Sequence, residues 1–270
     1  MPLTKETVPE PLLTRLTLRF GKDTLEVMLY NPLQDQAIIH RRFELPKEKT
    51  EHLAAIENFI YDNPVLTAEF QNTKILFDTP DFTILPAEID DSELIGKTLK
   101  AACPDIEQPY EIIINPIAGL DATLVFAVPQ NVINFVRRTF LNADVMHSLV
   151  PLSLYFASRW AAGAPPRMFV NLRHDEMDVI VTGHGRLLFA NRVVIRNPDD
   201  AVYYITALDK KVTPVEEILI GGNRELRDDL IGHLRRFHNY VMPMIFPSDM
   251  FRAGAESIDM PFDMVVTPLC

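Results

Sequence analysis

Two short segments of the chain carry the residue types best suited to bind a charged group. Each segment ends a run of apolar and polar residues and begins a turn, and the second lies 152 positions after the first. The residues are Arg19, Gly21, Lys22 and Asp23 in the first segment and Asn171, Arg173, His174 and Asp175 in the second. The basic side chains could bind a phosphate or a partner's carboxylate without a metal. The two aspartates could hold magnesium through water, or could bond their own backbone as ordinary turn residues.

A third segment of interest is Gly221-Gly222-Asn223, which follows the charged start and apolar run of residues 215–220. The pattern predicts a strand that ends in a double glycine at the entry to a helix. Residues without Cβ let a ligand ring or a second backbone approach closely. The alternative is a tight turn between strand and helix that binds no ligand.

No group of residues in the sequence has the spacing of a catalytic or metal site. The seven histidines are scattered, and His233 and His238 stand five positions apart, which places them on different sides of a helix. Cys103 and Cys270 are too far apart in sequence for a zinc signature or a disulfide framework. We therefore predict no catalytic residues and no metal.

The bulk composition is that of a globular protein with a strong acidic balance. The 26 basic and 37 acidic residues give a formal net charge of −11, which repels nucleic acid and anionic membrane surfaces. Residues 1–6 contain an acid and a proline where a signal peptide needs an apolar stretch, and no run is long enough to span a membrane. We expect a cytoplasmic protein that binds no nucleic acid, has no transmembrane segment and acts on an unknown protein partner.

Hydrophobic periodicity places the charged segments at the ends of strands in an α/β chain. The first part predicts strands over residues 12–20, 25–30 and 37–45, a helix over 51–61 and a strand pair over 74–77 and 82–85. It then predicts a helix over 91–103 with Leu94, Thr98 and Ala101 on one face, strands over 111–115 and 122–128, and helices over 130–140 and 150–162. The small residues and prolines of 161–166 indicate a linker. This divides the chain into residues 1–162 and 163–270.

The second part repeats the order of the first. It predicts strands over 168–172, 177–182 and 186–195, a helix from Pro198, and then the strand that leads to the double glycine. A shift of 152 positions lays residues 172–183 over residues 20–31, so that Asp23 meets Asp175 and Glu26 meets Asp178. We interpret this as an internal duplication, although two amphipathic hairpins can also align by chance.

A duplicated unit of three antiparallel strands and a helix is similar to the actin-like ATPase architecture, in which two ribonuclease-H-like halves face each other across a cleft. Residues 215–223 resemble the adenosine-contacting motif of that superfamily, especially of its pilus-assembly, secretion and cell-division members. Residues 170–204 carry a likeness to an uncharacterised bacterial family with this fold. The resemblance implies a nucleotide cleft formed by the three segments described above.

In actin-like ATPases the first strand of each half ends in Asp, any residue, Gly, and the resemblance aligns these triplets with Arg19-Phe20-Gly21 and Asn171-Leu172-Arg173. Both carboxylates that would hold magnesium are therefore replaced. We expect a non-catalytic, degenerate actin-like protein that needs no cofactor and works as an interaction or assembly module. The alternative is an ATPase or phosphotransferase that binds ATP with magnesium through nonstandard phosphate loops.

Overall fold

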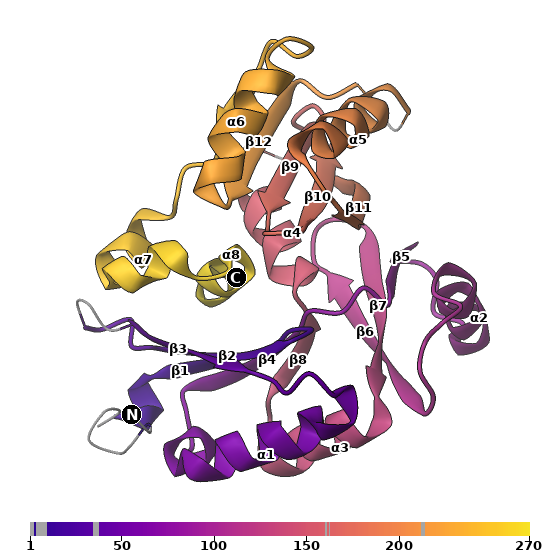
Figure 1. Cartoon of the computed structure of the whole chain (residues 1–270). Coiled ribbons are helices and arrows are strands. Elements are labelled where there is room, and N and C mark those ends of the chain that lie inside the picture. Colours follow the sequence, from indigo (N-terminus) through magenta and orange to yellow (C-terminus); the bar gives the residue numbers. More distant parts are fainter. Residues whose placement is uncertain (1–2, 4–9, 35–37, 160, 162, 212–213) are drawn as a thin grey trace.

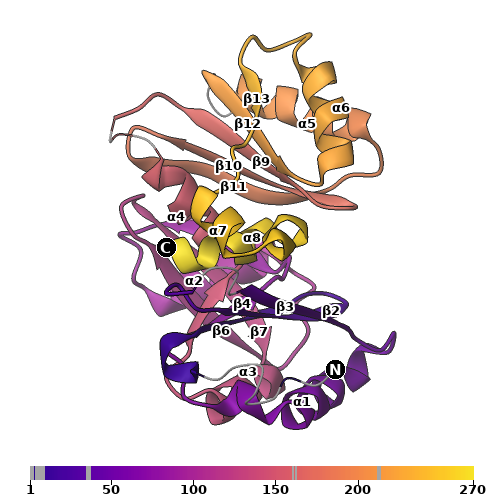
Figure 2. The same ribbon diagram turned by 90° about the vertical axis from the view of Figure 1, so that its left-hand side faces the viewer.

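A computed structural model describes residues 3, 10–34, 38–159, 161, 163–211 and 214–270. Two five-stranded sheets stand one above the other, with helices on their outer faces and a helical segment between them (Figures 1 and 2). A smaller sheet with its own helix lies to one side of the first sheet (Figure 1). No helix within the described ranges combines the length and the apolar character that crossing a membrane requires.

The first sheet has the order β3-β2-β1-β4-β8. Its strands are β1 (Arg15–Phe20), β2 (Thr24–Tyr30), β3 (Ile38–Glu44), β4 (Asn72–Phe77) and β8 (Asp144–His147). The first three strands are antiparallel, while β4 and β8 run parallel to β1. Strand β1 begins three residues later than the sequence predicts, because Pro11–Leu13 form a short 3-10 helix (η1). Because β1, β4 and β8 are parallel, their carboxyl ends meet at one edge of the sheet.

The second sheet repeats this order as β11-β10-β9-β12-β13. Its strands are β9 (Arg167–Leu172), β10 (Glu176–Gly183), β11 (Arg186–Val194), β12 (Glu217–Gly222) and β13 (Val241–Pro243). Arg19 pairs with Glu26 across the first hairpin, and Asn171 pairs with Asp178 at the corresponding place in the second. The repeated order is what an internal duplication would produce, and the duplication itself stays a prediction.

Two predictions for the middle of the chain are wrong. Strands β4 and β5 (Phe82–Pro86) do not pair with each other, because β5 lies in a separate sheet of order β5-β7-β6 with β6 (Tyr110–Ile117) and β7 (Ala122–Pro129). Helix α2 (Ser92–Ala102) packs on this sheet through Ile95 and Leu99, whereas Leu94 is exposed. Both faces of the helix carry apolar residues, so periodicity alone did not identify the buried one.

Helices cover the outer faces of the two large sheets (Figures 1 and 2). Under the first sheet lie α1 (His52–Asp62) and α3 (Gln130–Thr139), and over the second lie α5 (Pro198–Lys211) and α6 (Arg224–Leu234). Two further 3-10 helices flank α1, η2 (Lys49–Glu51) and η3 (Pro64–Thr67). The predicted helix over 150–162 is α4 (Leu149–Ser158), and residues 160 and 162 lie outside the described residues. The division at residue 162 therefore stays a prediction.

The carboxyl-terminal segment returns from the second half and lies between the two sheets (Figure 2). It comprises α7 (Ser248–Ala253), the 3-10 helix η4 (Ala255–Asp259), α8 (Phe262–Val266) and the 3-10 helix η5 (Thr267–Leu269). All five residues of α8 are buried, and Phe262 packs against Phe156 of α4 at 6.2 Å between ring centroids. Strand β2 is consequently buried along its whole length rather than on one face. The sequence analysis predicted no helix in this segment.

Candidate functional site

A cleft of about 780 Å³ opens between the two halves at the ends of β1, β9 and β12. Parallel strands in each sheet bring these ends to the same side, and the turns that follow them face one another across the cleft. All the residues singled out from the sequence line it: Arg19, Gly21, Lys22, Asp23, Asn171, Arg173, His174, Asp175, Gly221, Gly222 and Asn223. The structure therefore brings the three segments together, while nucleotide binding by them stays a prediction.

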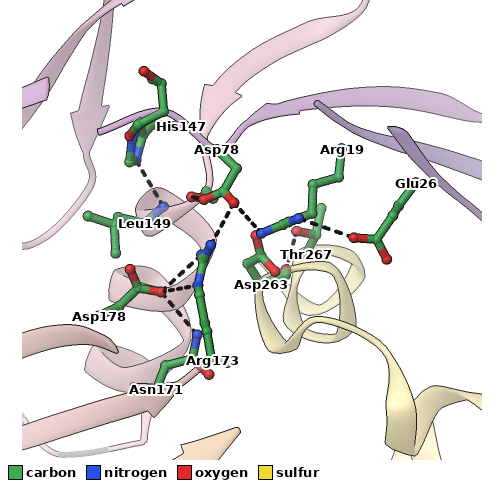
Figure 3. Close-up of polar contacts among 12 residues, drawn as sticks. Arg19, Glu26, Asp78, His147, Leu149, Asn171, Arg173, Asp178, Asp263 and Thr267 are labelled. Carbon is green, nitrogen blue, oxygen red and sulfur yellow. Dashed lines mark hydrogen bonds and ion pairs between the residues drawn. The ribbon is translucent and has the colours of Figure 1, made fainter. Parts of the chain in front are cut away.

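The inner wall of the cleft is a network of buried ion pairs centred on Asp78, the residue after β4 (Figure 3). The Asp78 carboxylate accepts from Arg19 Nη2 at 2.5 Å, from Arg173 Nη1 at 2.6 Å and from Ser148 Oγ at 3.0 Å. Arg192 Nη1 lies 2.6 Å from Asp78 Oδ1, the oxygen that also accepts from Ser148, whereas Arg19 and Arg173 donate to Oδ2. Arg173 and Arg192 belong to the second half, so one carboxylate of the first half ties the two halves together.

Arg19 reaches three carboxylates from different parts of the chain. Besides Asp78, its Nε donates to Asp263 Oδ2 of α8 at 2.7 Å and its Nη1 donates to Glu26 Oε1 of β2 at 3.1 Å (Figure 3). Glu26 is in turn 2.9 Å from His40 Nε2 on β3. The Arg19 side chain is only 7% exposed. Because these three carboxylates surround it, its positive charge is balanced by groups of the protein itself.

Asp178 forms the corresponding centre in the second half. Its carboxylate accepts from Asn171 Nδ2 at 3.0 Å, from Arg173 Nε at 3.1 Å and from Arg192 Nε at 2.8 Å. Glu26 and Asp178 occupy matching hairpin positions, and each pairs with the residue at the end of the neighbouring first strand. The same pair of hairpin positions is therefore bonded in both halves, and Asp78 links the two sets of contacts through Arg19 and Arg173.

The electrostatics of this network lower the pKa values of Asp78 and Asp178. Burial by itself raises the pKa of Asp78, but the nearby guanidinium groups of Arg19, Arg173 and Arg192 outweigh it and hold this pKa well below its usual value. The pKa of Asp178 is also lowered, because Arg173 and Arg192 outweigh the effect of its burial. Beside them, burial and then the charge of Arg192 lower the pKa of His147 to about 3, so this imidazole is neutral.

The remaining predicted residues lie at the mouth of the cleft. Lys22, Asp23, His174 and Asp175 are exposed on the two hairpin turns. The backbone carbonyls of Asp23 and Asp175 accept from Leu45 N and Ile195 N, at 2.9 and 2.8 Å. The two aspartates therefore occupy equivalent turns, and each turn is joined through its backbone to the residue that follows the third strand.

The double glycine is explained by packing inside the protein. Gly222 has a φ of +87°, and a Cβ there would collide with the carbonyl oxygen of Leu172. A Cβ on Gly221 would meet Cε of Met244, the flexible end of a side chain that covers this glycine and would have to shift. Asn223 caps α6 by accepting from Glu225 N at 3.1 Å and Leu226 N at 3.2 Å. The turn thus has a structural role whether or not a ligand binds.

Sequence reasoning missed six residues of the network: Glu26, Asp78, Ser148, Asp178, Arg192 and Asp263. Two of them could have been found from the sequence. Glu26 and Asp178 align with each other when the chain is shifted by 152 positions, and both are acidic residues within mainly apolar strands. Asp78 follows a strand that was predicted, but its partners lie 59 and 95 positions away.

Magnesium and ATP, which an actin-like fold implies, fit these residues poorly. The position that would carry the metal-holding carboxylate of the first strand is Arg19, which is already paired with Asp263, Asp78 and Glu26. In the second half Asn171 takes the equivalent position and donates to Asp178. Within the described residues no group of three or more histidine, cysteine, aspartate or glutamate side chains is arranged to hold a metal ion.

Comparisons with known proteins identify the fold. A Bacteroides thetaiotaomicron protein of actin-like ATPase fold and unknown function matches with a TM-score of 0.76 and 19% identity, over 96% of this chain and 97% of that one. A PilM-PilN type IV pilus biogenesis complex matches with a TM-score of 0.54 and 11% identity, over 95% and 98%. No curated protein matches the sequence. The chain has the actin-like ATPase fold, and because residues 7–241 match the family model described as "Protein of unknown function (DUF3822)", it belongs to that family.

Proposed function

We propose that this protein is a non-catalytic member of the actin-like fold that works as an interaction or assembly module. One observation carries the proposal. The ends of the two first strands, where actin-like ATPases hold magnesium and phosphate, are here joined by a buried network in which Asp78 pairs with Arg19, Arg173 and Arg192.

The charges around Arg19 support a non-catalytic role. A magnesium ion at the usual place would lie near Arg19 instead of a carboxylate, and like unit charges about 4 Å apart repel by about 4 kcal/mol at an effective dielectric near 20. Freeing Arg19 for a phosphate would strand buried Asp263 and Glu26, which are 1% and 3% exposed. An unpaired buried charge costs several kcal/mol. The internal carboxylates thus compete with a nucleotide for the same arginine.

The fold supports the assembly role, and the thiols support a cytoplasmic location. One solved structure that is similar in fold is a PilM-PilN type IV pilus biogenesis complex, which is an assembly of two proteins. Cys103 and Cys270 are both unpaired, as is typical of cytoplasmic proteins. We therefore place the module in the cytoplasm, with an unknown protein as its partner.

A second candidate function is the ATPase or phosphotransferase that the sequence left open. The observation in its favour is the open part of the cleft, where Lys22, His174 and Arg224 line the mouth outside the network. A nucleotide bound there would use nonstandard contacts and would leave the Asp78 network intact.

Thermal unfolding with and without millimolar ATP and magnesium distinguishes the two functions, because a ligand that binds the native state raises its stability. We expect no change in the unfolding temperature with ATP, ADP or GTP. A rise of several degrees would contradict the proposal. If it occurred, Lys22→Ala and His174→Ala should remove it, with the exposed Lys100→Ala of α2 as the matched control.

A further inference from the structure

A second hollow lies on the outer side of the second half, between α5 and the residues that follow α6. It has a volume of about 390 Å³ and is lined largely by apolar side-chain surface, including Tyr203, Thr206, Ala207, Lys210, Lys211 and Phe237. Two aromatic side chains flank it with most of their surface in solvent, since Tyr203 is 77% and Phe237 is 63% exposed. Exposed aromatic residues beside a groove are typical of protein-binding surfaces.

Buried polar atoms without a partner gather at the same pair of helices. Five buried side-chain nitrogen or oxygen atoms in the described residues have no hydrogen-bond partner, and three of them are Thr206 Oγ1, His233 Nδ1 and His238 Nε2. Thr206 lines the groove, and the two histidines lie in and just after α6. Buried polar groups are normally hydrogen-bonded. Of the three residues, Thr206 is the one in the described lining of the groove, and His238 Nε2 lies 3.8 Å from Asp209 Oδ2.

The charge of the groove is opposite to that of the whole chain. The described residues of its lining include Lys210 and Lys211 and no carboxylate, in a protein whose formal net charge is −11. Lysine side chains can lay their apolar stems along the groove and keep the ammonium groups at its rim. The complementary ligand has an apolar group for the floor and negative charge for the rim.

We propose that this groove, lined by Tyr203, Thr206, Ala207, Lys210, Lys211 and Phe237, binds an acidic segment of a partner protein. The segment inserts an apolar side chain between Tyr203 and Phe237 and places its carboxylates beside Lys210 and Lys211. The proposal rests on the interaction role and names the chemistry of the partner.

The size of the groove favours a short segment over a second folded surface. A stable interface between folded proteins uses about 20–30 residues on each side, whereas the described lining of this hollow is the six residues named above together with Val202. A single apolar anchor in a small pocket, surrounded by weaker polar contacts, is how a few residues supply most of the binding free energy.

Selection from a random peptide library on the immobilised full-length protein tests this inference without knowledge of the natural partner. We expect the enriched peptides to share an apolar residue flanked by aspartate or glutamate. Their affinity should fall about tenfold or more with Phe237→Ala, and also with the pair Lys210→Glu and Lys211→Glu. The matched controls are Phe251→Ala, a phenylalanine on α7 that is 58% exposed, and Lys97→Glu with Lys100→Glu on α2.

Several results would overturn the inference. These are the enrichment of no peptide, the enrichment of basic peptides, or equal binding by the groove variants and their controls. Concentration-dependent dimerisation that Phe237→Ala abolishes would assign the groove to a second copy instead. Unfolding curves of each variant show whether it folds. Because the assay uses no nucleotide, its failure is separate from the outcome of the ATP experiment.

Discussion

At the scale of single residues, the site is governed by the sharing of Asp78 among three arginines. Replacing Asp78 with asparagine leaves Arg19, Arg173 and Arg192 without their common carboxylate in a buried place. We expect Asp78→Asn to lower the free energy of unfolding by about 3–5 kcal/mol, as the loss of one partner from a buried ion pair does. Urea denaturation at pH 7 measures this. The exposed Asp228→Asn of α6 is the control and should change nothing measurable.

We also expect the stability difference between the wild type and Asp78→Asn to depend on pH. The folded protein holds the pKa of Asp78 below its unfolded value of about 3.9. The stability that this carboxylate contributes is therefore fully present above about pH 4 and is lost as the pH falls through the folded-state pKa. The advantage of the wild type over Asp78→Asn should shrink below about pH 4. An advantage that stays constant on acidification would show that the Asp78 carboxylate is not what stabilises the network.

At the scale of elements, the turn from β12 to α6 depends on a glycine that no other residue can replace without strain. Gly222 adopts a φ of +87° against the backbone of Leu172. We expect Gly222→Ala to destabilise the protein by at least about 2 kcal/mol, because both the backbone conformation and the contact oppose a Cβ. Chemical denaturation measures the loss.

The same helix supplies a matched control. Gly232 lies inside α6 with open space around it, so Gly232→Ala should stabilise the protein by about 0.5–1 kcal/mol through helix propensity. A neutral Gly222→Ala would mean that the turn can relax and that its glycine is free to face a ligand.

At the scale of the whole molecule, the carboxyl-terminal segment couples the two halves. Met264 of α8 is fully buried in a core that also contains Phe169 and Ile180 of the second sheet. We expect Met264→Ala to cost about 2–5 kcal/mol and to speed amide exchange in β1 and β9 by the same factor. Met242→Ala, at a position 39% exposed, is the control. Faster exchange in β1 alone would show that the halves unfold independently.

The sequence by itself determined the features that depend on neighbouring residues. Alternation and turn residues located both three-stranded units, the helix from Pro198 and the double-glycine turn, because strands and turns are encoded locally. The resemblance to actin-like proteins then predicted that three segments would meet, and all of their predicted residues line one cleft. The loss of the expected carboxylates at Arg19 and Asn171 was also visible in the sequence.

Only the tertiary structure decided which charges are paired and which faces are covered. Arg19 meets Asp263 across 244 positions because a carboxyl-terminal helix that was not predicted from the sequence returns between the sheets. The buried face of α2 was set by the sheet beneath it, since Leu94 and Ile95 are equally apolar. Long-range pairing depends on which strand ends meet in space, so a lone acidic residue such as Asp78 shows its role only when the chain has folded.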